Sequence, residues 1–90
     1  MRILIVEDEM LVAMQIENFL TASGHEVIGV AGRAADAIDL ATRQQPELAL
    51  IDINLAGGDN GIDLAAALRA QDIQIILATA IARPVSAVTS

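Results

Sequence analysis

The 90-residue sequence lacks cysteine, tryptophan, tyrosine and lysine, and its single aromatic residue is Phe19. Without cysteine, the chain has neither a disulfide nor a thiolate metal site, which agrees with a cytoplasmic protein. All five cationic residues are arginines, and twelve acidic residues outnumber them, so the formal net charge is −7. We therefore expect no binding to nucleic acid, because no basic patch is available to contact phosphates.

Long apolar runs are also missing, although 54% of the residues are hydrophobic. No run approaches the roughly 20 residues that cross a membrane. The apolar start is cut short by three consecutive acids at 7–9, so it does not resemble a signal peptide. We expect neither a membrane span nor export, and we expect residues 1–90 to form one small domain with an aliphatic core.

Short apolar runs and helical patterns alternate along the sequence. Continuous apolar runs predict buried strands at 3–6 and 48–51, and largely apolar segments predict two further strands at 27–31, which contains Gly29, and at 73–78. Amphipathic patterns between them predict helices at 10–22, 33–45 and 62–70. This alternation predicts an α/β fold, with a parallel sheet between layers of helices. A flavodoxin-like sheet would have the strand order 2-1-3-4.

The spacing of apolar residues also predicts which side of each helix faces the sheet. The residues expected to point inward are Val12, Ile16, Phe19 and Leu20 in the first helix, Ala34, Ile38 and Ala41 in the second, and Leu64, Ala65 and Leu68 in the third.

Polar side chains directly follow three of the predicted strands. Glu7 and Asp8 follow the first strand, Asp52 the third and Thr79 the fourth. Because the carboxyl ends of parallel strands meet at one edge, and strands one and three are neighbours in this order, we expect the acids to lie close together. Asp52 is expected to be rigidly held and half exposed. Carboxylates this close repel one another, so at least one is expected to have a raised pKa.

A hard divalent cation would relieve this repulsion. Mg²⁺ prefers oxygen ligands and retains several waters, so two carboxylates and a backbone carbonyl would be enough to hold it. A phosphoryl oxygen then has room at the metal, and Asp52 is placed to act as a nucleophile that forms an acyl phosphate. The hydroxyl of Thr79 would bond a phosphoryl oxygen.

Three segments carry a resemblance to the receiver domain of two-component response regulators over residues 2–80: Ile-Leu-Ile-Val-Glu7-Asp8-Glu9, Leu-Ala-Leu-Ile-Asp52-Ile-Asn54 and Ile-Leu-Ala-Thr79-Ala80. The resemblance implies that Asp52 takes a phosphoryl group from the phosphohistidine of a histidine kinase or phosphotransfer protein. Such a module is not an enzyme acting on other molecules, although it catalyses its own phosphorylation and dephosphorylation.

The resemblance also implies a role for each matching residue. Mg²⁺ would be held by the carboxylates of Asp8 and Asp52 and by the carbonyl oxygen of Asn54, with Glu7 acting through bound water. Thr79, with Ala80 beside it, would contact the phosphoryl group and act as the switch.

The sequence departs from the receiver pattern in three respects. The family has a fifth strand that ends on lysine and a fifth helix, whereas this chain stops at Ser90 and has no lysine. The loop after Asp52 has Leu55-Ala56 in place of Met-Pro, and Gly61 comes about one residue late. We expect Mg²⁺ to bind, with phosphorylation slow or weakly coupled to a conformational change. An unpaired fourth strand would also favour self-association.

The first helix carries more apolar residues than one buried stripe requires. Met10, Leu11 and Met14 fall on a different side from the expected core residues. This pattern fits a docking patch for the phosphohistidine partner, with adaptable methionine side chains. It fits equally well a helix packed on two sides, or ordinary exposed apolar residues.

Two other functions remain open at this point. One is a pseudo-receiver that is not phosphorylated and acts as a protein-interaction module. The other is a phosphatase that resembles the haloacid dehalogenases, which also use a strand-end aspartate with Mg²⁺. That family calls for a second aspartate at the position of Asn54 and for a catalytic lysine, and this sequence has neither.

Overall fold

The computed structural model describes residues 1–53, 55 and 58–78. The elements follow one another as β1 (Arg2–Val6), α1 (Met10–Ala22), β2 (Glu26–Ala31), α2 (Ala34–Gln44), β3 (Leu48–Ile51), α3 (Gly61–Arg69) and β4 (Gln74–Leu77). The strands form one parallel sheet in the order β2-β1-β3-β4. The predicted α/β alternation and strand order are confirmed.

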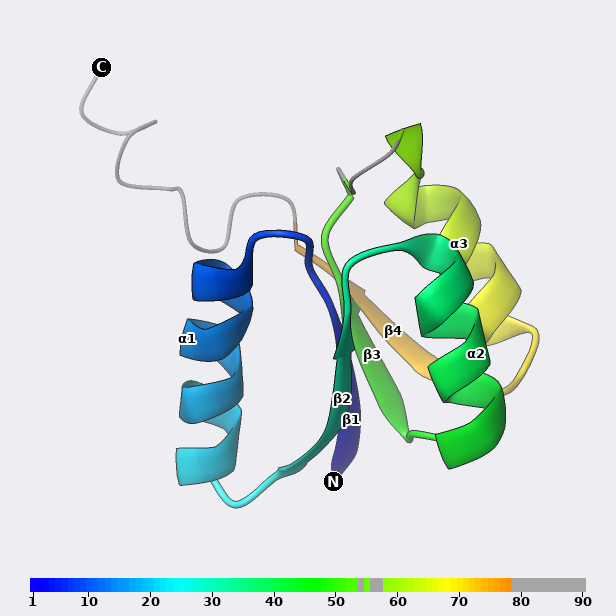
Figure 1. Ribbon diagram of the computed structural model, residues 1–90. Helices are drawn as coiled ribbons and strands as arrows, with labels where there is room; N and C mark the ends of the chain where they lie inside the picture. The colour runs from blue at the N-terminus through cyan, green and yellow to red at the C-terminus, as the bar shows by residue number, and fades with distance from the viewer. Residues whose placement is uncertain (54, 56–57, 79–90) are drawn as a thin grey trace.

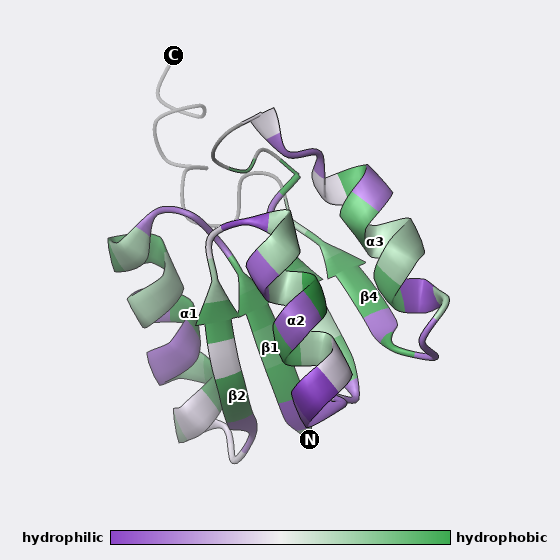
Figure 2. Cartoon of the chain, turned by 45° about the vertical axis from the view of Figure 1, so that its right-hand side comes forward, coloured by the Kyte–Doolittle hydropathy of each residue, from purple (hydrophilic) through white to green (hydrophobic). Residues whose placement is uncertain are grey.

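The helices cover both faces of the sheet, as Figure 1 shows, with α1 on one face and α2 and α3 on the other. The strands are coloured as hydrophobic along most of their length in Figure 2, whereas α2 carries polar residues on its outer side. Central strands buried on both faces require such apolar runs.

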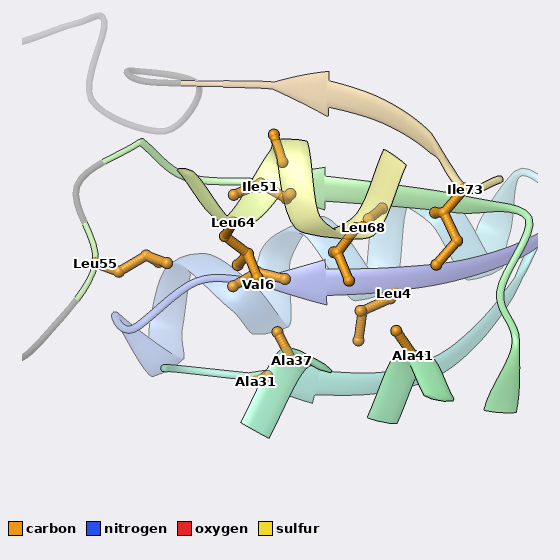
Figure 3. Close-up of a cluster of buried hydrophobic side chains, with 12 residues drawn as sticks. Leu4, Val6, Ala31, Ala37, Ala41, Ile51, Leu55, Leu64, Leu68 and Ile73 are labelled. Atoms are coloured by element: carbon orange, nitrogen blue, oxygen red, sulfur yellow. The ribbon is translucent and has the colours of Figure 1, made fainter. Parts of the chain in front are cut away.

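The main core lies between the sheet and the pair α2 and α3 (Figure 3). Leu4 and Val6 of β1 and Ile51 of β3 contribute side chains that are almost completely buried. From α3, Leu64 and Leu68 pack against them, and this confirms that side of the helix as the inward one. From α2, the buried side chains are the small ones of Ala37 and Ala41, and the partly buried Leu40 packs against the same core.

Two helix residues that were expected to face the core do not. Phe19 is 70% exposed and Ile38 is 38% exposed, so both predictions were wrong. Ala13 in α1 and Ala37 in α2 are buried instead, and Ala41 in α2 is buried as predicted. Because successive helix residues are about 100° apart, a helix that turns Ala37 to the sheet turns Ile38 partly away.

None of the helices within the described ranges is long and apolar enough to cross a membrane.

Candidate functional site

Three carboxylates lie together at the carboxyl edge of the sheet. Glu7, Asp8 and Asp52 each offer an oxygen atom, and these atoms all lie within 4.8 Å of one another. Strand register explains the proximity, because Val6 at the end of β1 pairs with Ile51 at the end of β3. The Asp52 N–H then donates to the carbonyl of Val6 at 2.9 Å. The residues that follow the two strands therefore emerge side by side.

The three acids differ in their exposure to solvent. Glu7 is 4% exposed and Asp52 is 3% exposed, whereas Asp8 is exposed. The expectation that Asp52 is half exposed was therefore wrong. The chain after β3 turns back over the strand end, where the Gly61 N–H donates to the carbonyl of Ile53 at 2.9 Å.

Burial changes the acidity of one member of the cluster. The pKa of Glu7 is raised from its ordinary value of 4.5 to about 7, chiefly because burial disfavours its charged form. The negative charge of Asp52 and hydrogen bonds with Asp8 and Asp52 act in the same direction. The Glu9 N–H, which donates to Glu7 Oε2 at 3.0 Å, opposes them. A raised pKa was predicted from charge repulsion, but burial is the larger cause.

This set of donors fits a hard divalent cation. Three carboxylate oxygens converge from two neighbouring strands, and oxygen is the donor that Mg²⁺ prefers. A cation here would also favour the ionised form of Glu7, which burial otherwise disfavours. The site therefore has both the ligand chemistry and an electrostatic reason to bind Mg²⁺.

The remaining predicted residues fall into two groups. Asn54, Thr79 and Ala80 lie outside the described residues, so their roles stay predictions. The three apolar residues of the predicted docking patch lie in the first turns of α1, directly after the acids at 7–9. Met10 is 63% exposed, Leu11 is 77% exposed and Met14 is 50% exposed. Their partner role also stays a prediction.

Sequence reasoning missed a group of residues at the end of the loop between β3 and α3. Asn60 caps α3, and its Oδ1 accepts from the backbone of Ile62 at 2.7 Å. Asp59 Oδ2 accepts from the backbone N–H of Ala34 at the start of α2, at 2.8 Å. The pair Asn60-Gly61 before a helical pattern is a recognisable N-cap signal. Nothing in the sequence indicated the contact of Asp59 with α2.

Neither of two cavities lined by described residues includes the three acids. One of about 590 Å³ lies at the opposite edge of the sheet, where its lining includes Met1, Glu47 and Gln74. A shallower one of about 350 Å³ lies over the β3–α3 loop, lined by Ile53, Leu55, Gly58, Asp59, Asn60 and Ile62. The three acids form a compact polar cluster, and the spacing of their oxygen atoms suits a small ion.

Comparison with known proteins gives the class to which this fold and site belong. The profile of the response regulator receiver domain matches residues 3–89. The phyllosphere-induced regulator PhyR of Methylorubrum extorquens is 41% identical over 80 residues, which is 87% of this chain and 30% of PhyR. The chain therefore belongs to the response regulator receiver domain family.

Solved structures support the same assignment. The receiver domain of Erythrobacter litoralis PhyR is 38% identical, with a TM-score of 0.83, and the match covers 88% of this chain and 62% of that one. PhyR of Bartonella quintana, in a complex with the anti-sigma factor NepR, is 35% identical with a TM-score of 0.83, over 93% of this chain and 35% of that one. The chain spans about a third of the length of the curated relatives that it matches.

Proposed function

We propose that the chain is a phosphoacceptor module in which Asp52 receives a phosphoryl group from a protein phosphohistidine. The observation that carries this proposal is the convergence of the three carboxylates, with oxygen atoms within 4.8 Å of one another, in a member of the receiver family. Asp52 directly follows β3, its N–H donates to the carbonyl of Val6, and the carbonyl of the next residue, Ile53, accepts from the Gly61 N–H.

The chemistry divides between the residues of the site. Asp8, Asp52 and the carbonyl of Asn54 would hold Mg²⁺, with Glu7 acting through bound water, and the ion would supply charge compensation for the incoming phosphoryl group. A carboxylate oxygen of Asp52 attacks phosphorus, and the phosphorus–nitrogen bond of the donor breaks. The electron pair of that bond returns to the imidazole, which then takes a proton from water. Thr79, next to Ala80, would donate its hydroxyl to a phosphoryl oxygen.

Acetyl phosphate tests this proposal without a partner protein. Incubation with Mg²⁺ should add one phosphoryl group to the chain, as measured by intact-protein mass spectrometry, and should add none to Asp52→Asn. Equal labelling of both proteins would remove Asp52 as the acceptor. Turnover of a phosphoester without a stable adduct would instead support the haloacid-dehalogenase-like alternative, and we propose that this turnover does not occur.

The phosphoryl donor that we propose is a histidine kinase or a histidine phosphotransfer protein in the cytoplasm. The docking patch, Met10, Leu11 and Met14, begins one residue after Glu9 and so borders the acid site. Exposed methionine side chains adapt to the shape of a partner. A partner helix bound over the start of α1 would bring its phosphohistidine to the acid edge of the sheet.

We also propose self-association through β4. Among the described residues, β4 pairs only with β3, so its outer edge presents unpaired backbone groups. Ile76 and Leu77 on this strand are 48% and 40% exposed. Light scattering should show a mass that rises with protein concentration, and Ile76→Lys should abolish the rise because a lysine at an edge strand opposes pairing. A monomer at high concentration in the unmodified chain would contradict the proposal.

A second function has one specific observation in its favour. PhyR of Bartonella quintana was solved in a complex with the anti-sigma factor NepR, so a relative of this chain binds a protein other than a kinase. The corresponding proposal here is a pseudo-receiver that works as a protein-interaction module without phosphorylation. Absence of Mg²⁺ binding in a calorimetric titration, together with absence of labelling by acetyl phosphate, would favour this second function.

A further inference from the structure

Helix α2 begins without a cap from its own sequence. Its N-cap residue, Arg33, makes no side-chain cap hydrogen bond. The N–H of Ala34 instead donates to Oδ2 of Asp59, 25 residues further along the chain, at 2.8 Å. The first N–H groups of a helix need such acceptors because they have no partner within the helix. Asp59 therefore supplies, from another loop, the cap that Arg33 does not.

The two residues after Asp59 connect that loop to two further elements. Asn60 caps α3 through the backbone of Ile62, and the Gly61 N–H donates to the carbonyl of Ile53 at 2.9 Å. Three consecutive residues thus contact α2, α3 and the end of β3. Of these three contacts, the one made by Asp59 links the loop that follows Asp52 to the start of α2.

The start of α2 also lies beside another member of the acid cluster. A Cβ atom placed on Gly32 would lie 3.6 Å from the Cα of Asp8. The Glu7 N–H donates to the carbonyl of Ala31 at 2.9 Å. The segment that leads into α2 therefore packs along Glu7 and Asp8, while the loop that ends at Asp59 starts from Asp52.

We propose that Asp59 is a positioning residue that adjusts, through its hydrogen bond to Ala34, the separation of Asp8 and Asp52 that the strand register first establishes. That bond joins the segment beside Asp8 to the loop after Asp52. It therefore controls how well the two carboxylates fit one cation. This inference rests on the proposed function, because it assigns Asp59 a role in Mg²⁺ binding and phosphoryl acceptance at the same site.

The ion pair of Asp59 with Arg33 is a smaller part of this arrangement. Arg33 Nε lies 3.7 Å from Asp59 Oδ2, and the Arg33 side chain is 58% exposed. An exposed pair at this distance contributes little to stability. Arg33→Ala is therefore a control that removes a neighbouring charge but leaves the hydrogen bond to Ala34 in place.

The first test measures Mg²⁺ affinity by calorimetry and the rate of labelling by acetyl phosphate, at a temperature where every variant is folded. Asp59→Ala should lower both by about tenfold or more, the range seen when residues supporting a metal site are removed. Asp59→Asn keeps an oxygen that accepts from Ala34 and should remain within about threefold of the original chain. Arg33→Ala should remain within about twofold.

Ala34→Pro tests the same bond from its other side. Proline lacks the N–H that Asp59 accepts, yet it is favoured at the first position of a helix. Arg33 has φ −134° and ψ 156°, a conformation compatible with a following proline. Ala34→Pro should therefore weaken Mg²⁺ binding as Asp59→Ala does, without destabilising α2. Combining the two substitutions should add no further loss, because both remove one interaction.

Asn60→Ala separates positioning from stability. It removes the cap of α3 and should cost about 1 kcal/mol of unfolding free energy, with Mg²⁺ affinity unchanged. The positioning role is overturned if Asn60→Ala, which is less stable, also binds Mg²⁺ more weakly while Ala34→Pro, which is not, binds it normally. It is also overturned if Asp59→Ala and Ala34→Pro both bind Mg²⁺ as tightly as the original chain. An unmodified chain that neither binds Mg²⁺ nor accepts phosphate would instead overturn the proposed function itself.

Discussion

Gly61 lies directly against the carbonyl oxygen of Asp52, so closely that a Cβ atom at position 61 would collide with it. The same residue donates its N–H to the carbonyl of Ile53. Both contacts are with backbone, which cannot move aside as a flexible side chain does. Glycine at this position therefore allows α3 to begin beside the end of β3 and to cover the candidate acceptor.

Gly61→Ala should lower the free energy of unfolding by about 1–3 kcal/mol, the usual cost of forcing extra atoms into a packed region. Urea denaturation followed by circular dichroism measures this loss. Gly32→Ala is a matched control on the other side of the acid cluster. The added Cβ atom there makes ordinary contacts at 3.6 Å and beyond, so stability should change by less than about 0.5 kcal/mol. Similar losses in both variants would contradict the close-contact explanation.

The raised pKa of Glu7 predicts how the stability of the metal-free chain changes with pH. The folded state binds the Glu7 proton more tightly than the unfolded state does, since the pKa is about 7 when folded and 4.5 ordinarily. This contribution is fully present below pH 4.5 and is lost as pH rises through about 7. Between these values, the free energy of unfolding should fall by up to a few kcal/mol.

Denaturation at closely spaced pH values, without Mg²⁺, measures this dependence, and Glu7→Gln provides its control. Glutamine has the shape of a protonated glutamate and does not titrate, so the decline over this pH range should largely disappear. A decline of the same size in Glu7→Gln would assign the titration to another group. Added Mg²⁺ should stabilise the original chain more at pH 8 than at pH 6, because the cation binds the ionised form.

Asp52→Asn should have opposite effects on the metal-free and the metal-bound chain. The substitution removes the negative charge that helps to raise the pKa of Glu7. At pH 8 without Mg²⁺, the variant should therefore be more stable than the original chain, by on the order of 1 kcal/mol. With millimolar Mg²⁺, the original chain should gain thermal stability and the variant should gain little.

Thermal melts of the original chain and of Asp52→Asn, each with and without Mg²⁺, give the four melting temperatures that this prediction compares. A melting temperature of the original chain that Mg²⁺ leaves unchanged would contradict the metal site. A metal-free variant less stable than the original chain would show that Asp52 contributes more through its hydrogen bonds than it costs through repulsion.

The sequence predicts the acid cluster well because an apolar run that ends on an acid carries two kinds of information. The run specifies a buried strand, and the parallel sheet then specifies the edge at which the acid emerges. Glu7, Asp8 and Asp52 came together for this reason. The burial of Asp52 was not predictable in the same way, because nothing in the sequence indicated that Gly61 packs against the backbone of Asp52.

Other features depend on contacts between segments far apart in the sequence. Asp59 and Ala34 are 25 residues apart, and neither belongs to a pattern that indicates the other. The inward sides of α1 and α2 were misjudged at Phe19 and Ile38 for a different reason. Size and hydrophobicity favoured Phe19 and Ile38, whereas the residues that α1 and α2 bury include the small Ala13 and Ala37.

Substitution of an exposed apolar residue at the start of α1 should slow phosphoryl transfer from a protein donor but not from acetyl phosphate. Leu11 is 77% exposed, so Leu11→Ser should change the free energy of unfolding by less than about 0.5 kcal/mol. If the docking patch contacts the phosphohistidine protein, transfer from that protein should slow by about tenfold, as for loss of a well-placed interface residue. Labelling by acetyl phosphate should not change, because that donor needs no docking surface.

Phe19→Ser is the matched control for Leu11→Ser. Phe19 is also apolar and 70% exposed, but it lies two turns further along α1, away from the acids. If docking is confined to the start of the helix, this substitution should change neither transfer from the phosphohistidine protein nor labelling by acetyl phosphate. Slower transfer in both variants would extend the docking surface along α1. Normal transfer in Leu11→Ser would identify its exposure as the ordinary exposure of apolar residues on a small protein.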